Sequence, residues 1–308
     1  MRIGMVTDSL GSLSFDEMVE TAASLGIETV EFGCGGWSSA PHLDLDAMLD
    51  SQTTRDNFMA KLKDHGLEIS ALNCSGNQLA PGELGKDNDA VVRKTFKLAK
   101  MLGVTRIVMM SGLPGGPGDA NANWITTAWP PQVHGILKYQ WEEVAIPYWK
   151  ELVIDARENG IEKICIEQHA SQLVYNTASA LKLRDVAGEM VGVNFDPSHA
   201  LWMGGDPLFA IRHLGDAIYH VHAKDTRVDP QNAALNTRLE TLTNEHIAER
   251  AWNYVTLGYG HGELWWRDFV SQLRQAGYDD VLSIEHEDFN LPPVVGVEKS
   301  VALLRNVI

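Results

Sequence analysis

Four side chains of the kind that bind divalent cations each follow a different short apolar run of the sequence. They are Glu167 in EKICIEQH, Asp196 in VGVNFDPSH, His222 in IYHVHAKD and Glu285 in DVLSIEHED. Each run is typical of a buried strand, and a barrel of parallel strands would bring their carboxyl ends together around one axis. Three carboxylates and one imidazole form a ligand set that Mn²⁺, Mg²⁺, Co²⁺ or Zn²⁺ accepts. The sequence therefore predicts one divalent-metal site, with Mn²⁺ as the first expectation.

Two other interpretations of these residues compete with a catalytic metal. Single charges at strand ends are often solvated loop residues, but four such ends would gather carboxylates whose charges repel one another without a cation. A structural metal is the other alternative, although a set with one imidazole and open positions favours catalysis. His169 lies two residues after Glu167 on the same face of its strand, where an imidazole beside the metal could act as a base.

Strand and helix patterns alternate along the whole chain and predict how these residues are positioned. Eight apolar runs are separated by amphipathic stretches, and Ser14 with Glu17 forms a capping-box pattern before one of them. This alternation predicts a single-domain (β/α)8 TIM barrel over residues 1–308. An open doubly wound sheet is disfavoured because no GxGxxG turn follows the first strand. The long segments 113–138 and 226–262 are expected to lie over the C-terminal face of the barrel, where barrel active sites form.

Composition limits the classes of partner. The chain of 308 residues carries 41 acidic and 25 basic side chains, for a formal net charge of −16. Such a surface repels a phosphate backbone, so nucleic acid is not an expected partner. Three cysteines without a CxxC pair indicate neither a disulfide framework nor a zinc knuckle. No signal-peptide pattern or long apolar segment is present, which favours a cytoplasmic enzyme without a membrane span.

Five motifs together resemble the xylose-isomerase-like TIM-barrel superfamily, in its sugar phosphate isomerase/epimerase branch. They are IEQH, NFDPSHALW, HVHAKD, GYGHGELWW and SIEHED, and the resemblance extends over essentially the whole chain. It implies a sugar or glycoside substrate, a catalytic metal held by the four residues above, and catalysis by Glu167 and Glu285, to which we add His169. The substrate contacts that we expect are His199, Lys224, Trp202 and Arg227.

The sequence also departs from the ketose 3-epimerases of that branch. Those enzymes carry a second Glu where this chain has Leu173, and an Arg where it has Val228, with Arg227 one residue earlier. The segments NANW, AWPP and EQHASQLVYN are more similar to lyase subunits that cleave 3-oxo-glycosides, including C-glycoside deglycosidases. An isomerase or epimerase is the first hypothesis, and a lyase that acts by β-elimination is the second.

Two further classes of protein are alternatives to an isomerase or a lyase. An AP endonuclease of the same superfamily would need more His ligands and a basic surface, and the charge of −16 speaks against it. A non-catalytic metal-binding or sugar-binding subunit stays open. We expect a homo-oligomer, or a hetero-oligomer with a small partner subunit, in which 113–138 and 226–262 cap the site or form the interface.

Overall fold

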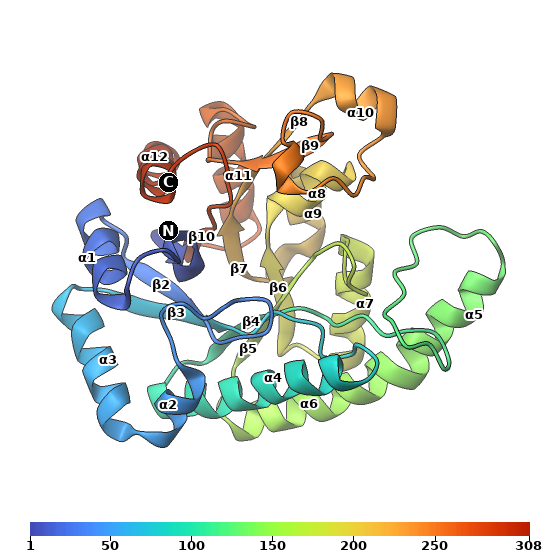
Figure 1. The fold of residues 1–308 in the computed structure, drawn as a ribbon, viewed down its shortest axis with the longest axis horizontal. Helices are drawn as coiled ribbons and strands as arrows, with labels where there is room; N and C mark the ends of the chain where they lie inside the picture. The colour runs from blue at the N-terminus through green and yellow to red at the C-terminus, as the bar shows by residue number, and fades with distance from the viewer.

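Eight parallel strands close into a barrel. The structure is a computed structural model that describes all residues 1–308. Its barrel strands, which Figure 1 labels, are hydrogen-bonded in the order β1-β10-β7-β6-β5-β4-β3-β2. The barrel strands are β1 (Arg2–Val6), β2 (Thr29–Gly33), β3 (Glu68–Asn73), β4 (Arg106–Met109), β5 (Lys163–Glu167), β6 (Val191–Phe195), β7 (Ile218–Ala223) and β10 (Val281–Ile284). Each lies within one of the eight apolar runs, so the predicted (β/α)8 barrel is confirmed.

Helices cover the outside of the barrel. They are α1 (Phe15–Leu25), α2 (Leu45–Asp50), α3 (Gln52–Asp64), α4 (Glu83–Leu102), α5 (Gln132–Tyr139), α6 (Ile146–Glu158), α7 (Thr177–Ala187), α8 (Pro197–Met203), α9 (Pro207–Leu214), α10 (Pro230–Asn236), α11 (Glu263–Gln275) and α12 (Pro293–Val307). The capping box predicted before α1 is present, since the Ser14 and Glu17 side chains each bond the other residue's backbone N–H. Apolar side chains fill the space between strands and helices, and Trp149 and Trp266 are fully buried there.

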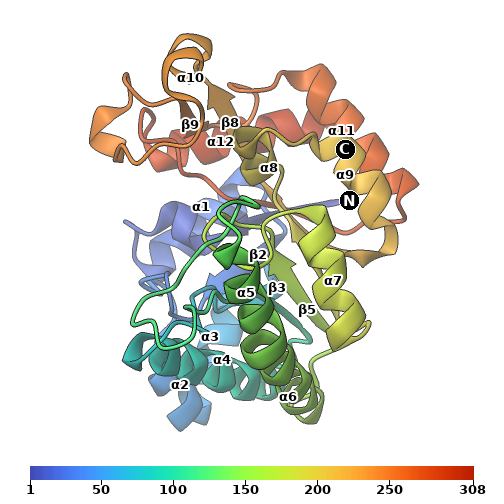
Figure 2. The same cartoon turned by 90° about the vertical axis from the view of Figure 1, so that its right-hand side faces the viewer.

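Single side chains determine where three of the elements begin or end. The amphipathic stretch 45–64 is two helices, because Ser51 ends α2 and its hydroxyl caps α3. Pro147 has no N–H to donate, and it lies in the first turn of α6 after a π-helical segment, Gln140–Ala145. In Figure 2, α5 and α6 follow one another as nearly one rod. The run 191–199 ends as a strand at Phe195, and Pro197 begins α8.

The segment 226–262 contains structure of its own. Strands β8 (Asp225–Val228) and β9 (Trp252–Val255) pair antiparallel, and α10 lies between them in the chain. The buried carboxylate of Asp225 accepts hydrogen bonds from the backbone N–H groups of Gly258, Gly260 and His261, which fixes the return of the chain toward α11. The two-stranded sheet and α10 stand beside α8 in Figure 1.

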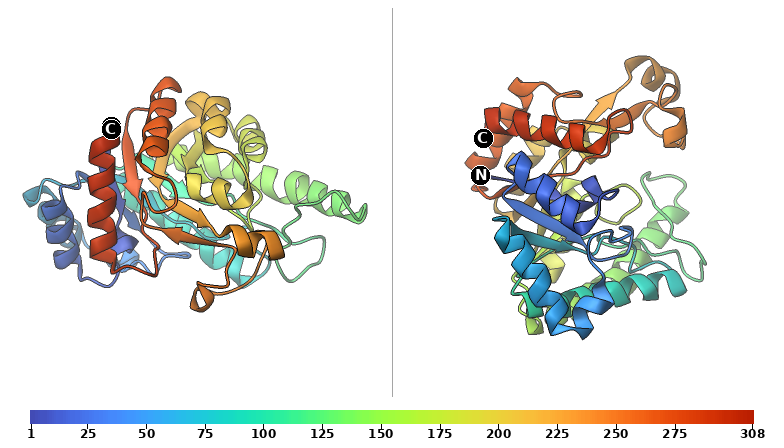
Figure 3. Two further views of the ribbon diagram at one scale, coloured as in Figure 1. Left: turned by 90° about the horizontal axis from the view of Figure 1, so that it is seen from above. Right: turned by 60° about the vertical axis from the view of Figure 1, so that its left-hand side comes forward.

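The chain ends meet where the barrel closes. Strand β1 pairs with β10 from Arg2↔Val281 to Met5↔Ile284, and Figure 3 shows the two termini near each other. None of the helices is both long and apolar enough to span a membrane.

Candidate metal centre

The four predicted ligands come together at the carboxyl ends of their strands. Glu167 is the last residue of β5, Asp196 follows β6 and caps α8, His222 lies near the end of β7, and Glu285 follows β10. One nitrogen or oxygen atom from each lies within 4.8 Å of the others. Strands β10 and β5 lie on opposite sides of β7 in the barrel, so the two glutamates approach the imidazole from different sides.

His222 Nδ1 is the centre of this cluster. It lies 3.3 Å from Glu167 Oε2 and 3.2 Å from Glu285 Oε2, yet it has no hydrogen-bond partner. The buried Asp196 Oδ2 also has none, while Asp196 Oδ1 accepts from the backbone N–H of Ser198. Unpaired buried polar atoms of this kind cost free energy and indicate an ion or water that completes them.

The cluster concentrates negative charge in a buried place. Burial favours the neutral imidazole, but Glu31 and Glu285 outweigh it and hold the pKa of His222 well above its usual value. Burial raises the pKa of Asp196 well above the ordinary range, and the neighbouring charges of Glu167 and Glu285 raise it further. Protons at these two side chains therefore occupy the place that a divalent cation can take. Three carboxylates and one imidazole nitrogen fit a cation such as Mn²⁺, Mg²⁺, Co²⁺ or Zn²⁺.

His199 extends the cluster toward the segment 226–262. Its Nε2–H donates to Glu167 Oε1 at 2.9 Å, and its Nδ1 accepts from the Tyr254 hydroxyl at 3.0 Å. Burial and the neighbouring His169 lower the pKa of His199 to about 3, so the ring is neutral. Tyr254 lies in β9, which places the β8–β9 sheet in contact with the metal centre.

His169 lies beside His199 and near Glu167, with which the sequence predicts that it shares a face. The two rings meet edge to face with centroids 4.3 Å apart. His169 Nδ1 donates to the carbonyl oxygen of Ala170 at 2.6 Å, so Nε2 carries the free lone pair. The residue is half-buried, and one of its ring nitrogens lies close to Glu167.

Lys224 supplies the positive charge of the site. Its Nζ lies 3.2 Å from Glu285 Oε2 and 2.5 Å from Glu287 Oε2, and it also lies over the ring of Tyr254. Lys224, an expected substrate contact, thus forms ion pairs with two glutamates of the β10 end. Burial opposes ionisation of Glu285, but Lys224 and His222 lower its pKa to about 2.

Comparison with known protein families identifies the family of the chain. The family model described as Xylose isomerase-like TIM barrel matches residues 19–307. The chain belongs to this family. Uncharacterized protein YfiH of Bacillus subtilis (strain 168) is 50% identical over 311 residues, which cover 100% of this chain and 99% of the relative. Inosose dehydratase of Bacillus cereus (strain AH820) is 32% identical over 88 residues, 28% of this chain and 29% of the relative.

Two solved structures of other proteins share the fold. The IOLI protein with a binding zinc atom superposes with a TM-score of 0.70 at 19% identity, over 100% of this chain and 98% of that one. D-psicose 3-epimerase with D-tagatose from Clostridium cellulolyticum has a TM-score of 0.65 at 15% identity, over 100% and 99% of the two chains. Proteins that share this fold thus include one named as an epimerase and one solved with a bound zinc atom.

Two of the expected substrate contacts of this family member lie away from the cluster. Trp202 is buried and stacks on Trp252 with ring centroids 4.5 Å apart. Its ring therefore anchors the segment around β9 against α8. Arg227 is exposed on β8 and lines a separate hollow of about 490 Å³ together with Arg238 and His261. Neither side chain forms a hydrogen bond or ion pair with the four candidate ligands.

Sequence reasoning missed three residues that contact the cluster. Glu31 in β2 accepts from the Nε2 atoms of His220 and His222, Tyr254 contacts His199, and the Asn194 amide donates to Glu167 Oε2 at 3.1 Å. A carboxylate in the middle of the buried strand ETVEFG was the one signal available for Glu31. No pattern in the long segment 226–262 could show that Tyr254 folds back over β7.

Proposed function

We propose that this member of the xylose isomerase-like family is a divalent-metal-dependent sugar isomerase or epimerase. The observation that carries the proposal is the placement of Glu167 and Glu285 on two sides of His222 Nδ1, at 3.3 and 3.2 Å. A reaction that removes a proton from one face of a carbon and returns one to the opposite face is served by two acid–base side chains, one on each side. Glu167, Asp196, His222 and Glu285 would hold the cation, with Mn²⁺ as the preferred ion.

Glu285 is the better placed base of the two glutamates. Its side chain is 21% exposed, whereas that of Glu167 is 4% exposed and is held by His199. The low pKa of Glu285 keeps it ionised near neutral pH, and Lys224 holds it in place. When bound, the cation supplies Lewis acidity toward a substrate carbonyl, which makes the neighbouring carbon proton more acidic.

Glu167 serves the other side of the reacting carbon in this proposal. His199 and Asn194 donate to its two oxygens, so its position is fixed. Burial opposes ionisation of Glu167, but the hydrogen bond from His199 and the nearby imidazole of His222 hold its pKa well below the usual range. A group that returns a proton must first receive one, and the half-buried His169 beside it is the route from solvent that we infer.

A lyase is the second candidate, and the free Nε2 of His169 favours it. On a 3-oxo-glycoside, a base removes the proton next to the carbonyl, the bond to the leaving group at the adjacent carbon breaks, and the leaving group takes up a proton. Leu173 is buried and apolar where ketose 3-epimerases carry a carboxylate. His169 would therefore both remove the proton and protonate the leaving group. The partial match to a protein named inosose dehydratase is consistent with elimination chemistry. A partner subunit could complete such a site.

Proton NMR in D₂O distinguishes the two activities. The protein is loaded with Mg²⁺ or Co²⁺ and offered free ketoses, ketose phosphates and 3-oxo-glucosides. Deuterium in a rearranged but intact sugar supports the isomerase or epimerase. Release of an aglycone with an unsaturated sugar instead supports the lyase. The absence of both deuterium exchange and aglycone release with every one of these sugars, for the metal-loaded protein, contradicts both activities.

A further inference from the structure

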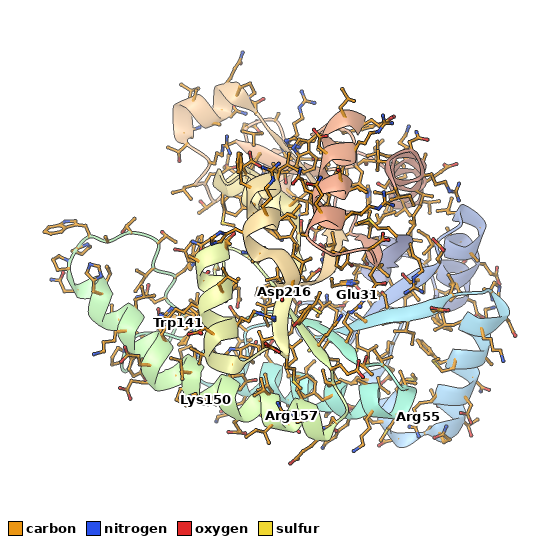
Figure 4. The ribbon with its side chains drawn as sticks, turned by 180° about the vertical axis from the view of Figure 1, so that it is seen from behind. Glu31, Arg55, Trp141, Lys150, Arg157 and Asp216 are labelled. Carbon is orange, nitrogen blue, oxygen red and sulfur yellow. The ribbon has the colours of Figure 1, made fainter.

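Glu31 is a carboxylate of the barrel interior that accepts hydrogen bonds from several side chains. It projects from β2 toward β7, and in the barrel order β1 and β10 separate these two strands. The side chain is fully buried. Its oxygens accept from His220 Nε2 at 2.7 Å, His222 Nε2 at 3.0 Å and Asn73 Nδ2 at 2.7 Å. Figure 4 labels Glu31 among the barrel strands, well inside the molecule.

This arrangement decides which nitrogen of His222 carries a proton. An ionised carboxylate can only accept hydrogen bonds, so each imidazole nitrogen facing Glu31 must be an N–H donor. His222 then has its proton on Nε2, and the lone pair of the neutral ring is on Nδ1. Nδ1 is the atom that faces Glu167 and Glu285 and has no hydrogen-bond partner.

His220 is bonded on both ring nitrogens and is therefore not free to bind a cation. Its Nε2–H donates to Glu31, and its Nδ1 lies 3.5 Å from Arg106 Nη1. Arg106 is in turn paired with Asp280 at the amino end of the barrel. The group of Glu31, His220 and His222 thus has its hydrogen-bonding capacity used internally, which marks it as support for the metal centre and not as a second metal site.

We infer that Glu31 is a positioning residue that presents His222 to the cation through Nδ1. The inference rests on the proposed metal centre and concerns a residue that does not touch the substrate. A carboxylate that accepts from the far nitrogen of a ligating histidine fixes its tautomer and ring orientation and makes it a better ligand. Loss of such a partner typically weakens metal binding by about 10- to 100-fold.

The first test is the variant Glu31→Gln. Its amide offers one acceptor oxygen and one NH2 donor group in place of two acceptor oxygens, so the N–H donors of His220, His222 and Asn73 can no longer all be satisfied. The proton of His222 is then no longer fixed on Nε2. Calorimetric titration of the metal-stripped protein with Zn²⁺ should show a Kd raised by about 10- to 100-fold. The matched control is Ser283→Ala, which removes a weaker neighbour at 3.5 Å from the same carboxylate and should leave the Kd within about twofold. Equal Kd values for Glu31→Gln and the wild type would overturn the inference.

A second measurement uses the wild-type protein and needs no variant. Nitrogen-15 NMR of the Zn²⁺-loaded protein, labelled at histidine, reports which ring nitrogen is protonated. We expect a proton on His222 Nε2 and the metal-bound shift on Nδ1. A proton on Nδ1, or metal on Nε2, would overturn the inference even if Glu31→Gln does not fold. Absence of Zn²⁺ binding by the wild type would instead remove the proposed function. A proton detected on His222 Nε2 in the metal-free protein, hydrogen-bonded to Glu31, would still test the contact with Glu31.

Discussion

Glu285 is the residue on which the proposed chemistry depends most. Replacing Glu285 with Gln removes the base but keeps the shape of the side chain, so the fold should be retained. General-base catalysis by one residue is worth about 10²- to 10⁴-fold, and we expect carbon-proton exchange in D₂O to fall by at least about 10²-fold. The loss should appear in kcat for any sugar that the wild type turns over.

A neighbouring glutamate provides the control for that variant. Glu287 also pairs with Lys224, but its side chain is 43% exposed and it is not among the four candidate ligands. Glu287→Gln should keep exchange within a few-fold of the wild type, while circular dichroism confirms that both variants fold. Exchange in Glu285→Gln at the level of Glu287→Gln would show that Glu285 is not the base.

Cation binding should depend on pH, because protons and the cation compete for the same atoms. The pKa values of His222 and Asp196 are both raised well above their usual values, so each side chain must lose a proton when a cation binds. The affinity for Mn²⁺ should therefore rise with pH through the neutral range. Calorimetry in buffers of different ionisation enthalpy should detect protons released on binding. An affinity that stays constant with pH would contradict these protonation states.

At the scale of elements, the β8–β9 sheet should matter for the site. Tyr254→Phe removes the hydroxyl that donates to His199 Nδ1 at 3.0 Å and leaves that buried nitrogen unpaired. We expect the free energy of unfolding in urea to fall by about 1–3 kcal/mol, together with a decrease in kcat because His199 no longer holds Glu167 as firmly. Tyr259→Phe is the control, since Tyr259 is 51% exposed and should behave as the wild type.

The barrel was predictable from the sequence because its signals are local. Apolar runs, a capping box and glycines after helices each depend on neighbours in the chain. The break at Ser51 and the short helix after Asp196 were missed, since a side-chain cap in one case and a proline in the other ended elements that hydrophobicity alone would continue. The antiparallel pair inside 226–262 was missed as well, because its strands are short and lie more than twenty residues apart.

The convergence of the four candidate ligands could be predicted for the same reason, whereas their supporting residues could not. Glu167, Asp196, His222 and Glu285 each end a recognisable strand, and parallel strands that close into a barrel must bring such ends together. Glu31 and Tyr254 act through contacts between residues that are distant in the chain. Arg227 was expected from its spacing in the sequence, and spacing does not fix the direction of a side chain once the chain leaves a strand.

At the scale of the whole molecule, the cation should stabilise the fold. A ligand that binds only the native state adds about 4 kcal/mol to the free energy of unfolding when its concentration is about 1,000 times its Kd. Relief of repulsion among three buried carboxylates is the physical source of this gain. We expect the Tm of the metal-stripped protein to rise on addition of Mn²⁺ or Zn²⁺ and to fall again with a chelator. A Tm unaffected by Mn²⁺, Mg²⁺, Co²⁺ and Zn²⁺ alike would contradict a metal centre.

The most direct test of the central claim is the metal content of the purified protein under titration. Metal-stripped wild-type protein is titrated with Mn²⁺, and the bound ion is counted by elemental analysis after removal of the excess. We expect a single bound Mn²⁺ ion per chain in the wild type, and none at the same free Mn²⁺ concentration in either Asp196→Asn or His222→Ala. An ion retained at full occupancy by both variants, or none bound by the wild type, would contradict it.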